Sequence, residues 1–316
     1  MKKILILGAS GFIGRNLFFH FSKKKKFKCY GTYFRNRPKQ KLFKNLLKIN
    51  LTNQTKVDVL INKIKPDIVI QAAATTSGAK DIISRPYIHV NENAIINSVI
   101  TKSCFDNDVK HFIFLSCTVM YRGSDKALKE TDFNPNDEMY RNYFGGGWMK
   151  VFVEKLCEFY SRICKMKFTI VRHSNIYGPF DKFDLDKSHV FGATVTKVLN
   201  SDNIINIWGN GNETRDFLYI TDLISFIDLS IKNQKKNYEI FNVGSSKNLS
   251  INSLAKKIIK LSKKNIKISH DLTKKSLNNS VKLNIQKSKK ILYWYPKVSI
   301  DSGIKKTLTW YKENYL

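Results

Sequence analysis

Apolar, strand-like runs alternate with amphipathic segments along the first half of the chain. The strand-like runs cover residues 4–7, 28–34, 67–72, 111–116 and 168–172. The segments with helical periodicity cover residues 15–21, 53–64, 94–105 and 151–163. Strands buried on both faces have continuous apolar runs, and strands that alternate with helices are typical of right-handed βαβ units. The pattern therefore predicts a parallel sheet covered by helices on both faces.

The regular alternation ends near residue 175. Beyond this point the pattern predicts helices near residues 189–200 and 250–262 and a strand near 204–208. We expect an α/β fold in which a doubly wound parallel sheet carries a smaller mixed α/β C-terminal region. The expected sheet domain covers residues 1–174 with a return segment near 213–245, and the smaller region covers 175–212 and 246–316.

The composition adds a large positive charge to this picture. The 316 residues include 55 Lys+Arg against 25 Asp+Glu, a formal net charge of +30. Hydrophobic residues make up 42% of the chain, which is enough for a core and excludes a disordered polycation. The lysines are spread evenly, and no basic-aromatic recognition motif accompanies them. We therefore expect no nucleic-acid partner and interpret the excess as compositional bias.

The five cysteines contain no CxxC pair, so the sequence predicts neither a disulfide framework nor a zinc site. The apolar run after Met1 is too short for a signal peptide. No stretch approaches the roughly 20 apolar residues that a membrane span requires. We expect a cytoplasmic protein without a metal ion and without membrane contact.

A glycine motif, Gly8-x-x-Gly11-x-x-Gly14, joins the first strand to the first helix. The first glycine allows a tight turn, the second lets the backbone approach a pyrophosphate, and the third allows close packing of helix and strand. The free N–H groups of the helix N-terminus favour an anion. The motif predicts a Rossmann-type dinucleotide site. The loop residues expected at the cofactor are Gly8, Ser10, Gly11, Phe12, Ile13 and Gly14.

The segment after the second strand bears on the choice between NAD and NADP. NAD sites place an Asp or Glu about 20 residues beyond the glycine motif, at the ribose 2′-hydroxyl. Residues 30–37 contain no carboxylate but include Arg35 and Arg37, whose planar guanidinium groups suit a 2′-phosphate. We therefore expect NADP, with NAD possible. The alternative is that both arginines are ordinary surface charges.

Several further motifs resemble the extended short-chain dehydrogenase/reductase family of nucleotide-sugar epimerases, dehydratases and reductases. The similar segments are residues 8–14, 72–74, 172–179, 215–222 and 241–244. Within the family the chain is most similar to the GDP-L-fucose synthase branch, through residues 93–98, 188–190 and 208–211. The resemblance covers essentially the whole chain. It implies NAD(P)-dependent chemistry on a nucleotide-diphosphate sugar, in this branch GDP-linked, by a homodimer that serves surface-polysaccharide synthesis.

The resemblance also implies roles for individual residues. It adds to the cofactor site Asn50, Leu51, Ala72, Ala73, Ala74, Lys150 and His173. It assigns to the substrate Asn175, His189, Lys197, Trp208 and Arg215. His189 matches a histidine that acts as an acid in epimerisation, and Arg215 matches an arginine that binds the diphosphate.

The catalytic centre departs from the family pattern, in which a tyrosine precedes a lysine by four residues on one helical face. Lys150 fits the lysine, but Gly146 takes the place of the tyrosine, and Tyr143 lies seven residues before Lys150. Glycines at 145–147 disfavour a continuous helix, because each costs about 1 kcal/mol relative to alanine. Three interpretations remain open: a non-helical glycine segment brings Tyr143 to the site; a substrate group, water or His189 supplies the proton; or Gly146 is an engineered replacement.

The position of the family's Ser or Thr is also altered. Cys117 takes that place, while Thr118 or Ser116 offers a hydroxyl after a small shift. Cys117 is either a buried structural cysteine or a functional one. Val119 takes the place of the epimerisation base of the GDP-L-fucose synthases. The expected function is NADP-dependent reduction of a 4-keto nucleotide sugar, with Tyr143 as proton donor. The alternatives are an epimerase with tightly bound NAD(P) and a catalytically impaired Rossmann protein.

Overall fold

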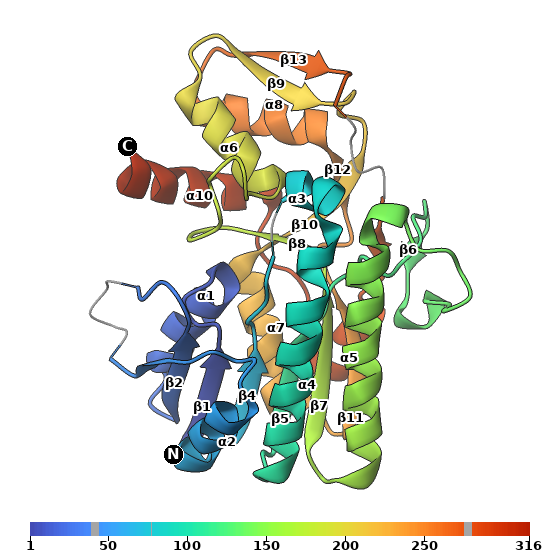
Figure 1. Cartoon of the computed structure of the whole chain (residues 1–316). Coiled ribbons are helices and arrows are strands. Elements are labelled where there is room, and N and C mark those ends of the chain that lie inside the picture. The colour runs from blue at the N-terminus through green and yellow to red at the C-terminus, as the bar shows by residue number, and fades with distance from the viewer. Residues whose placement is uncertain (39–43, 77, 275–279) are drawn as a thin grey trace.

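A seven-stranded sheet forms the centre of the molecule in the computed structural model, which describes residues 1–38, 44–76, 78–274 and 280–316. The strand order is β11-β7-β5-β4-β1-β2-β3, and every neighbouring pair is parallel (Figure 1). The strands are β1 (Lys2–Leu7), β2 (Phe27–Tyr33), β3 (Leu46–Lys48), β4 (Ile68–Gln71), β5 (His111–Leu115), β7 (Lys167–His173) and β11 (Tyr238–Val243). The order runs outward in both directions from β1 and β4, which confirms the predicted doubly wound fold.

Helices cover both faces of this sheet. Ile4 and Ile6 of β1 belong to a core that includes α1 (Phe12–Ser22) and α7 (Ile220–Asn233). Leu5 and Leu7 face the other side, where α2 (Gln54–Ile64), α4 (Asn91–Asp106) and α5 (Phe144–Ile163) pack. Successive strand residues point to opposite faces, so burial on both sides explains the uninterrupted apolar runs.

The remaining elements lie mostly beyond the carboxyl ends of the strands (Figure 1). Three small sheets are formed by β8, β10 and β12, by β9 and β13, and by β6 and β14. Their bounds are β6 (Ala127–Leu128), β8 (Asn175–Tyr177), β9 (Ile204–Trp208), β10 (Thr214–Tyr219), β12 (Asn248–Ser250), β13 (Lys267–Asp271) and β14 (Lys282–Leu283). The other helices are α3 (Ala79–Ser84), α6 (Val190–Asn200), α8 (Ile251–Ser262), α9 (Gln286–Leu292) and α10 (Ile300–Tyr315).

The return segment expected near residues 213–245 divides between two sheets. Only β11 joins the main sheet, where it pairs with β7. β10 pairs instead with β8 and β12 in the three-stranded sheet. The chain therefore crosses between the two regions at residue 220, where α7 begins.

The start of α5 corrects the expectation of a non-helical glycine segment. The helix begins at Phe144, seven residues before the predicted start at residue 151, and runs through all three glycines. Val90 and Met139 lie close to where side chains at Gly145 and Gly147 would be. Close packing against these neighbours, together with the buried residues further along α5, offsets the low helix propensity of glycine.

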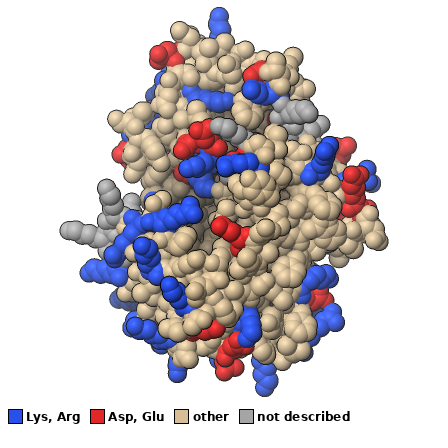
Figure 2. Space-filling view, viewed as in Figure 1, with Lys and Arg blue, Asp and Glu red and all other residues tan. Residues whose placement is uncertain are grey.

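The surface carries its charge without one dominant patch in the view of Figure 2. Lys and Arg side chains are spread over this face, with Asp and Glu among them, and the face is hollowed between the sheet and the upper group of elements. None of the helices in the four described ranges is long and apolar enough to span a bilayer.

Candidate active site

The glycine loop closes tightly onto the neighbouring strand. Gly8 has φ +77°, and a Cβ there would lie 2.6 Å from Cα of Ala73, just after β4. A Cβ on Gly14 would lie 2.2 Å from the carbonyl oxygen of Gly8. The amide of Ala72 donates to the carbonyl of Leu7 over 3.1 Å. The loop therefore requires glycine at positions 8 and 14, and it brings residues 72–74 against the predicted cofactor site.

The start of α1 fits a dinucleotide pyrophosphate. Gly11 is the N-cap residue, and no side chain among the described residues accepts a cap hydrogen bond there. The first-turn amides of a helix need partners from outside, and an anion supplies them. Ser10, Phe12 and Ile13 are half-buried around this loop. Arg15 donates to the carbonyl of Ser10 over 3.2 Å, which holds the loop to the helix.

The residues predicted at the adenosine end lie after β2 and β3, beside the glycine loop. Arg35 and Arg37 are exposed, and the Arg35 guanidinium lies 5.6 Å from the ring centre of Phe34. Leu51 is buried, and the side chain of Asn50 accepts a hydrogen bond from the amide of the neighbouring Thr52. Both arginines are therefore open to solvent.

Lys150 reaches the carboxyl end of β5 from α5. Its Nζ donates to the carbonyl of Leu115 over 2.8 Å and lies 4.7 Å from the ring centre of Phe114. Burial lowers the pKa of Lys150, while the negative forms of Cys117 and Glu154 oppose this shift. The amine is thus held beside Cys117 in a poorly solvated place.

Tyr143 and Cys117 belong to the same cluster. Tyr143 ends the 3₁₀ helix η3 (Arg141–Tyr143), and its ring centre lies 5.7 Å from that of Tyr140. Burial raises the pKa of Tyr143, while Arg215 opposes the shift and Cys117 adds to it. Burial also raises the pKa of the Cys117 thiol, against the field of Lys150. Cys117 is therefore close enough to interact electrostatically with both Tyr143 and Lys150.

Thr118 lies in the turn that follows β5. Its carbonyl accepts a hydrogen bond from the amide of Tyr121 over 3.1 Å, so the chain from Thr118 to Tyr121 is a turn and not a strand. Thr118 and Val119 are both half-buried beside Cys117. Cys117 and Val119 therefore do not follow the alternation of faces that a strand imposes.

A buried ion pair lies next to the cluster of Lys150, Cys117 and Tyr143. The Arg172 guanidinium, on β7, contacts Glu154 of α5 at 2.6 Å, and Ser116 donates to Glu154 over 2.6 Å. Arg172 also donates to the hydroxyl of Tyr121 over 2.9 Å. The network connects α5, the end of β5 and β7, one helical turn from Lys150.

Two histidines complete the predicted catalytic and cofactor set. His173 ends β7, and burial lowers its pKa to about 4, with Lys150 and His189 adding to the shift. His189 is the N-cap residue of α6 and is exposed. Desolvation lowers its pKa to about 4, and Lys182 and His89 add to this shift. Both shifts favour the neutral imidazole, whereas an acid role for His189 uses the protonated form.

The predicted substrate residues fall into two groups. Asn175 of β8 donates to the carbonyl of Asp216 over 3.1 Å, next to Arg215 on the paired strand β10. Arg215 is near enough to Tyr143 to affect its pKa. Lys197 donates instead to the carbonyl of Asn206 over 2.7 Å and connects α6 to β9. Trp208 ends β9 with 37% of its surface exposed.

His89 and Lys182 are site residues that the sequence did not indicate. Both lower the pKa of His189. Lys182 donates to the carbonyl of Thr76 over 2.7 Å, and a ring nitrogen of His89 lies 3.3 Å from the carbonyl of Thr75. Neither lies in a motif, and each reaches the site only through the folding of the loop after β4, so the sequence carried no signal for them.

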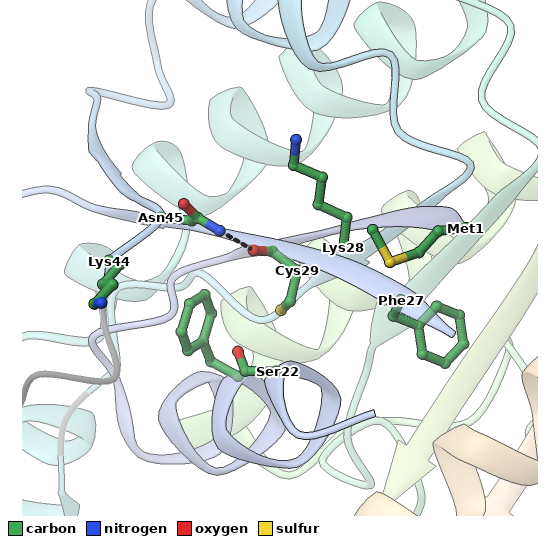
Figure 3. Close-up of a pocket in the computed structure, with 8 residues that line it drawn as sticks. Met1, Ser22, Phe27, Lys28, Cys29, Lys44 and Asn45 are labelled. Carbon is green, nitrogen blue, oxygen red and sulfur yellow. Dashed lines mark hydrogen bonds between the residues drawn. The ribbon is translucent and has the colours of Figure 1, made fainter. Parts of the chain in front are cut away.

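A separate hollow of about 550 Å³ lies at the amino end of β2, away from the glycine loop (Figure 3). It is lined by Met1, Phe18, Ser22, Phe27, Lys28, Cys29, Lys44 and Asn45. Asn45 donates to the carbonyl of Cys29 across it, over 3.2 Å. Ligands of doubly wound folds bind beyond the carboxyl ends of the strands, so this hollow is not part of the site. The described ranges contain no cluster of three or more His, Cys, Asp or Glu side chains that could hold a metal ion.

The fold and the site define an NAD(P)-dependent oxidoreductase or epimerase of the extended short-chain dehydrogenase/reductase type. The chain belongs to the NAD dependent epimerase/dehydratase family, whose model matches residues 4–244. It is 27% identical to the GDP-L-colitose synthase of Yersinia pseudotuberculosis, over 98% of this chain and 97% of that one. It is 29% identical to a GDP-L-fucose synthase of Sinorhizobium fredii, over 82% and 83%. These relatives confirm the resemblance to the GDP-L-fucose synthase branch.

The fold is also that of a solved epimerase. The crystal structure of the UDP-glucose 4-epimerase of Thermotoga maritima with UDP-glucose matches with a TM-score of 0.88 at 22% identity. The match covers 99% of this chain and 100% of that one. At this identity the likeness concerns the fold alone.

Proposed function

We propose that the protein is an NADP-dependent reductase of a GDP-linked 4-keto sugar. The observation that supports this most directly is the gathering of Tyr143, Cys117 and Lys150 beside Arg215, on the same side of the sheet as the glycine loop. A phenol, a buried amine and a guanidinium are the groups needed to protonate a sugar oxygen and bind a diphosphate. The GDP-L-colitose synthase and the GDP-L-fucose synthase described above support guanine as the base.

The proposed roles divide the reaction between four residues and the cofactor. The nicotinamide cofactor, when bound, supplies the hydride. Tyr143 donates a proton to O4 of the sugar, and Thr118 hydrogen-bonds the same oxygen. Lys150 holds a cofactor hydroxyl and adds positive charge beside the developing alkoxide. Arg215 pairs with the diphosphate through its bidentate fork.

The state of Tyr143 favours reduction over epimerisation. Burial raises the pKa of this phenol above its ordinary value of about 10, so the phenol carries its proton at neutral pH. An epimerase with tightly bound cofactor must first remove a proton from a sugar hydroxyl, which needs a phenolate. Val119 also offers no base for removing a proton from a ring carbon. A reductase therefore uses this site in the protonation state that its surroundings favour.

NADP is the proposed cofactor because of the residues after β2. Arg35 and Arg37 are both exposed there, and no carboxylate stands between residues 30 and 37. A carboxylate would accept from a ribose 2′-hydroxyl, whereas guanidinium groups attract a 2′-phosphate.

The test is to follow NADPH absorbance with purified protein and GDP-4-keto-6-deoxy-D-mannose. We expect one NADPH to be consumed for each sugar reduced, with NADH a poorer donor. GDP-D-mannose, which has no ketone, is the control and should consume none. Conversion of the sugar to an epimer without loss of NADPH would instead identify an epimerase. Absence of any turnover by protein that still binds NADPH would identify an impaired enzyme.

We also propose that the protein is a homodimer that pairs through α4 and α5. These helices lie side by side on one face of the sheet (Figure 1). Their outer surface exposes large apolar side chains, namely Ile95, Phe144, Phe152, Phe159 and Ile163. A partner that covers this surface would remove it from water. A cytoplasmic location and a role in surface-polysaccharide synthesis stay predictions of the sequence.

A further inference from the structure

The three glycines at the start of α5 have different surroundings. A Cβ on Gly145 would lie 2.8 Å from a methyl carbon of Val90, and one on Gly147 would lie 2.6 Å from the sulfur of Met139. A Cβ on Gly146 would meet no atom of the described residues within 4 Å. Packing therefore accounts for glycine at positions 145 and 147 but not at 146, where helix propensity disfavours it as well.

The space beside Gly146 opens towards the site. Residues four apart on a helix share a face, so Gly146 faces the same side as Lys150, whose amine reaches the end of β5. Tyr143, the proposed proton donor, directly precedes α5, three residues before Gly146. The space is therefore on the face of α5 that carries Lys150, within one turn of Tyr143.

We propose that the space beside Gly146 is a subsite for an uncharged substituent of the sugar ring, so that residue 146 determines which sugars the enzyme accepts. The Lys150 amine already donates to the carbonyl of Leu115 and lies against the ring of Phe114, and Cys117 is half-buried, so a methyl or hydroxymethyl group fits there better than a carboxylate. The diphosphate, the charged part of the substrate, is proposed to pair with Arg215 of β10. The inference rests on the nucleotide-sugar activity of the family and not on the proposed direction of the reaction.

A size series at position 146 tests this subsite. Gly146→Phe fills the space with a bulky apolar ring, and Gly146→Ala, the matched control, adds only the Cβ for which room exists. Isothermal titration of NADP-saturated protein would measure binding of GDP and of GDP-D-mannose, with UDP and UDP-glucose in parallel. We expect Gly146→Phe to bind the sugar nucleotide that wild type prefers about 10-fold more weakly. Binding of the corresponding nucleotide diphosphate should stay within about twofold in both variants.

Three results would overturn the subsite. One is Gly146→Phe binding sugar nucleotides as tightly as wild type, and another is an equal loss for GDP and GDP-D-mannose. The third is a loss of sugar-nucleotide binding in Gly146→Ala equal to that in Gly146→Phe, because the structure has room for the Cβ of alanine. Thermal melting and NADPH binding establish that each variant is folded, and Gly146→Val serves if the phenylalanine variant is not. Failure of the proposed reductase is seen separately, as wild-type protein that consumes no NADPH.

Discussion

At the scale of single residues, burial disfavours the charged forms of the groups of the site. It raises the pKa values of Tyr143 and Cys117 and lowers those of Lys150, His173 and His189. The sequence identified all five residues, but their protonation states depend on neighbours from other elements.

Replacing Tyr143 with phenylalanine tests the proton donor. Loss of the hydroxyl should lower kcat about 100-fold, because general acid catalysis typically contributes this much. The KM for NADPH should change little, since the glycine loop is untouched. Steady-state rates with the GDP-linked 4-keto sugar measure both constants.

Tyr140→Phe is the matched control, because Tyr140 packs on Tyr143 and belongs to the same segment. It should retain a rate close to that of wild type. An undiminished rate in Tyr143→Phe would assign the proton to a water molecule, a substrate group or His189 instead.

At the scale of secondary structure, α5 shows where local propensity and tertiary packing disagree. Three glycines argue against a helix at residues 145–147, yet the helix forms there. Met149, Val153 and Cys157 bury the rest of α5 in the core, and an established helix extends at little cost. Helix propensity accounts only for the cost of each glycine. Val90 and Met139, which leave little room for a Cβ at positions 145 and 147, approach these positions only in the folded chain.

The exposed apolar face of α4 and α5 predicts the behaviour of one surface variant. Phe152 is 46% exposed on α5, and Phe152→Glu would place a charge in the proposed dimer interface. We expect this variant to sediment as a monomer at concentrations where wild type is a dimer, because an unpaired charge is costly in an apolar interface. Leu272→Glu, on the turn after β13, is the control and should sediment like wild type. A wild-type monomer, or a variant that stays dimeric, would contradict the interface.

At the scale of the whole molecule, a buried hydrogen-bond chain connects the strands at the amino end of the sheet. A ring nitrogen of His111 on β5 lies 2.7 Å from the hydroxyl of Thr169 on β7, and that hydroxyl contacts Gln234, the residue after α7. Burial lowers the pKa of His111 to about 3. The folded protein therefore keeps this imidazole neutral in mild acid.

This histidine predicts how stability depends on pH. The folded pKa of His111 is below the ordinary value of about 6.5, so its contribution is complete above that pH and is lost as the pH falls towards 3. Its share of the loss should reach at most about 1.4 kcal/mol per pH unit. His111→Gln cannot titrate, so its free energy of unfolding should fall less steeply between pH 6 and 4 than that of wild type. Urea titrations at each pH measure this, and parallel curves for the two proteins would refute it.

The sequence by itself determined the parallel sheet, the glycine loop and the family. These depend on local requirements: strands buried on both faces need continuous apolar runs, and Gly8 and Gly14 stand where a side chain cannot fit. Only the tertiary structure decided that the glycine run is helical, that Gly146 faces open space, and that His89 and Lys182 adjoin His189. These features depend on contacts between different elements of the folded chain, such as Val90 with Gly145 and His89 with His189, whose approach no local pattern encodes.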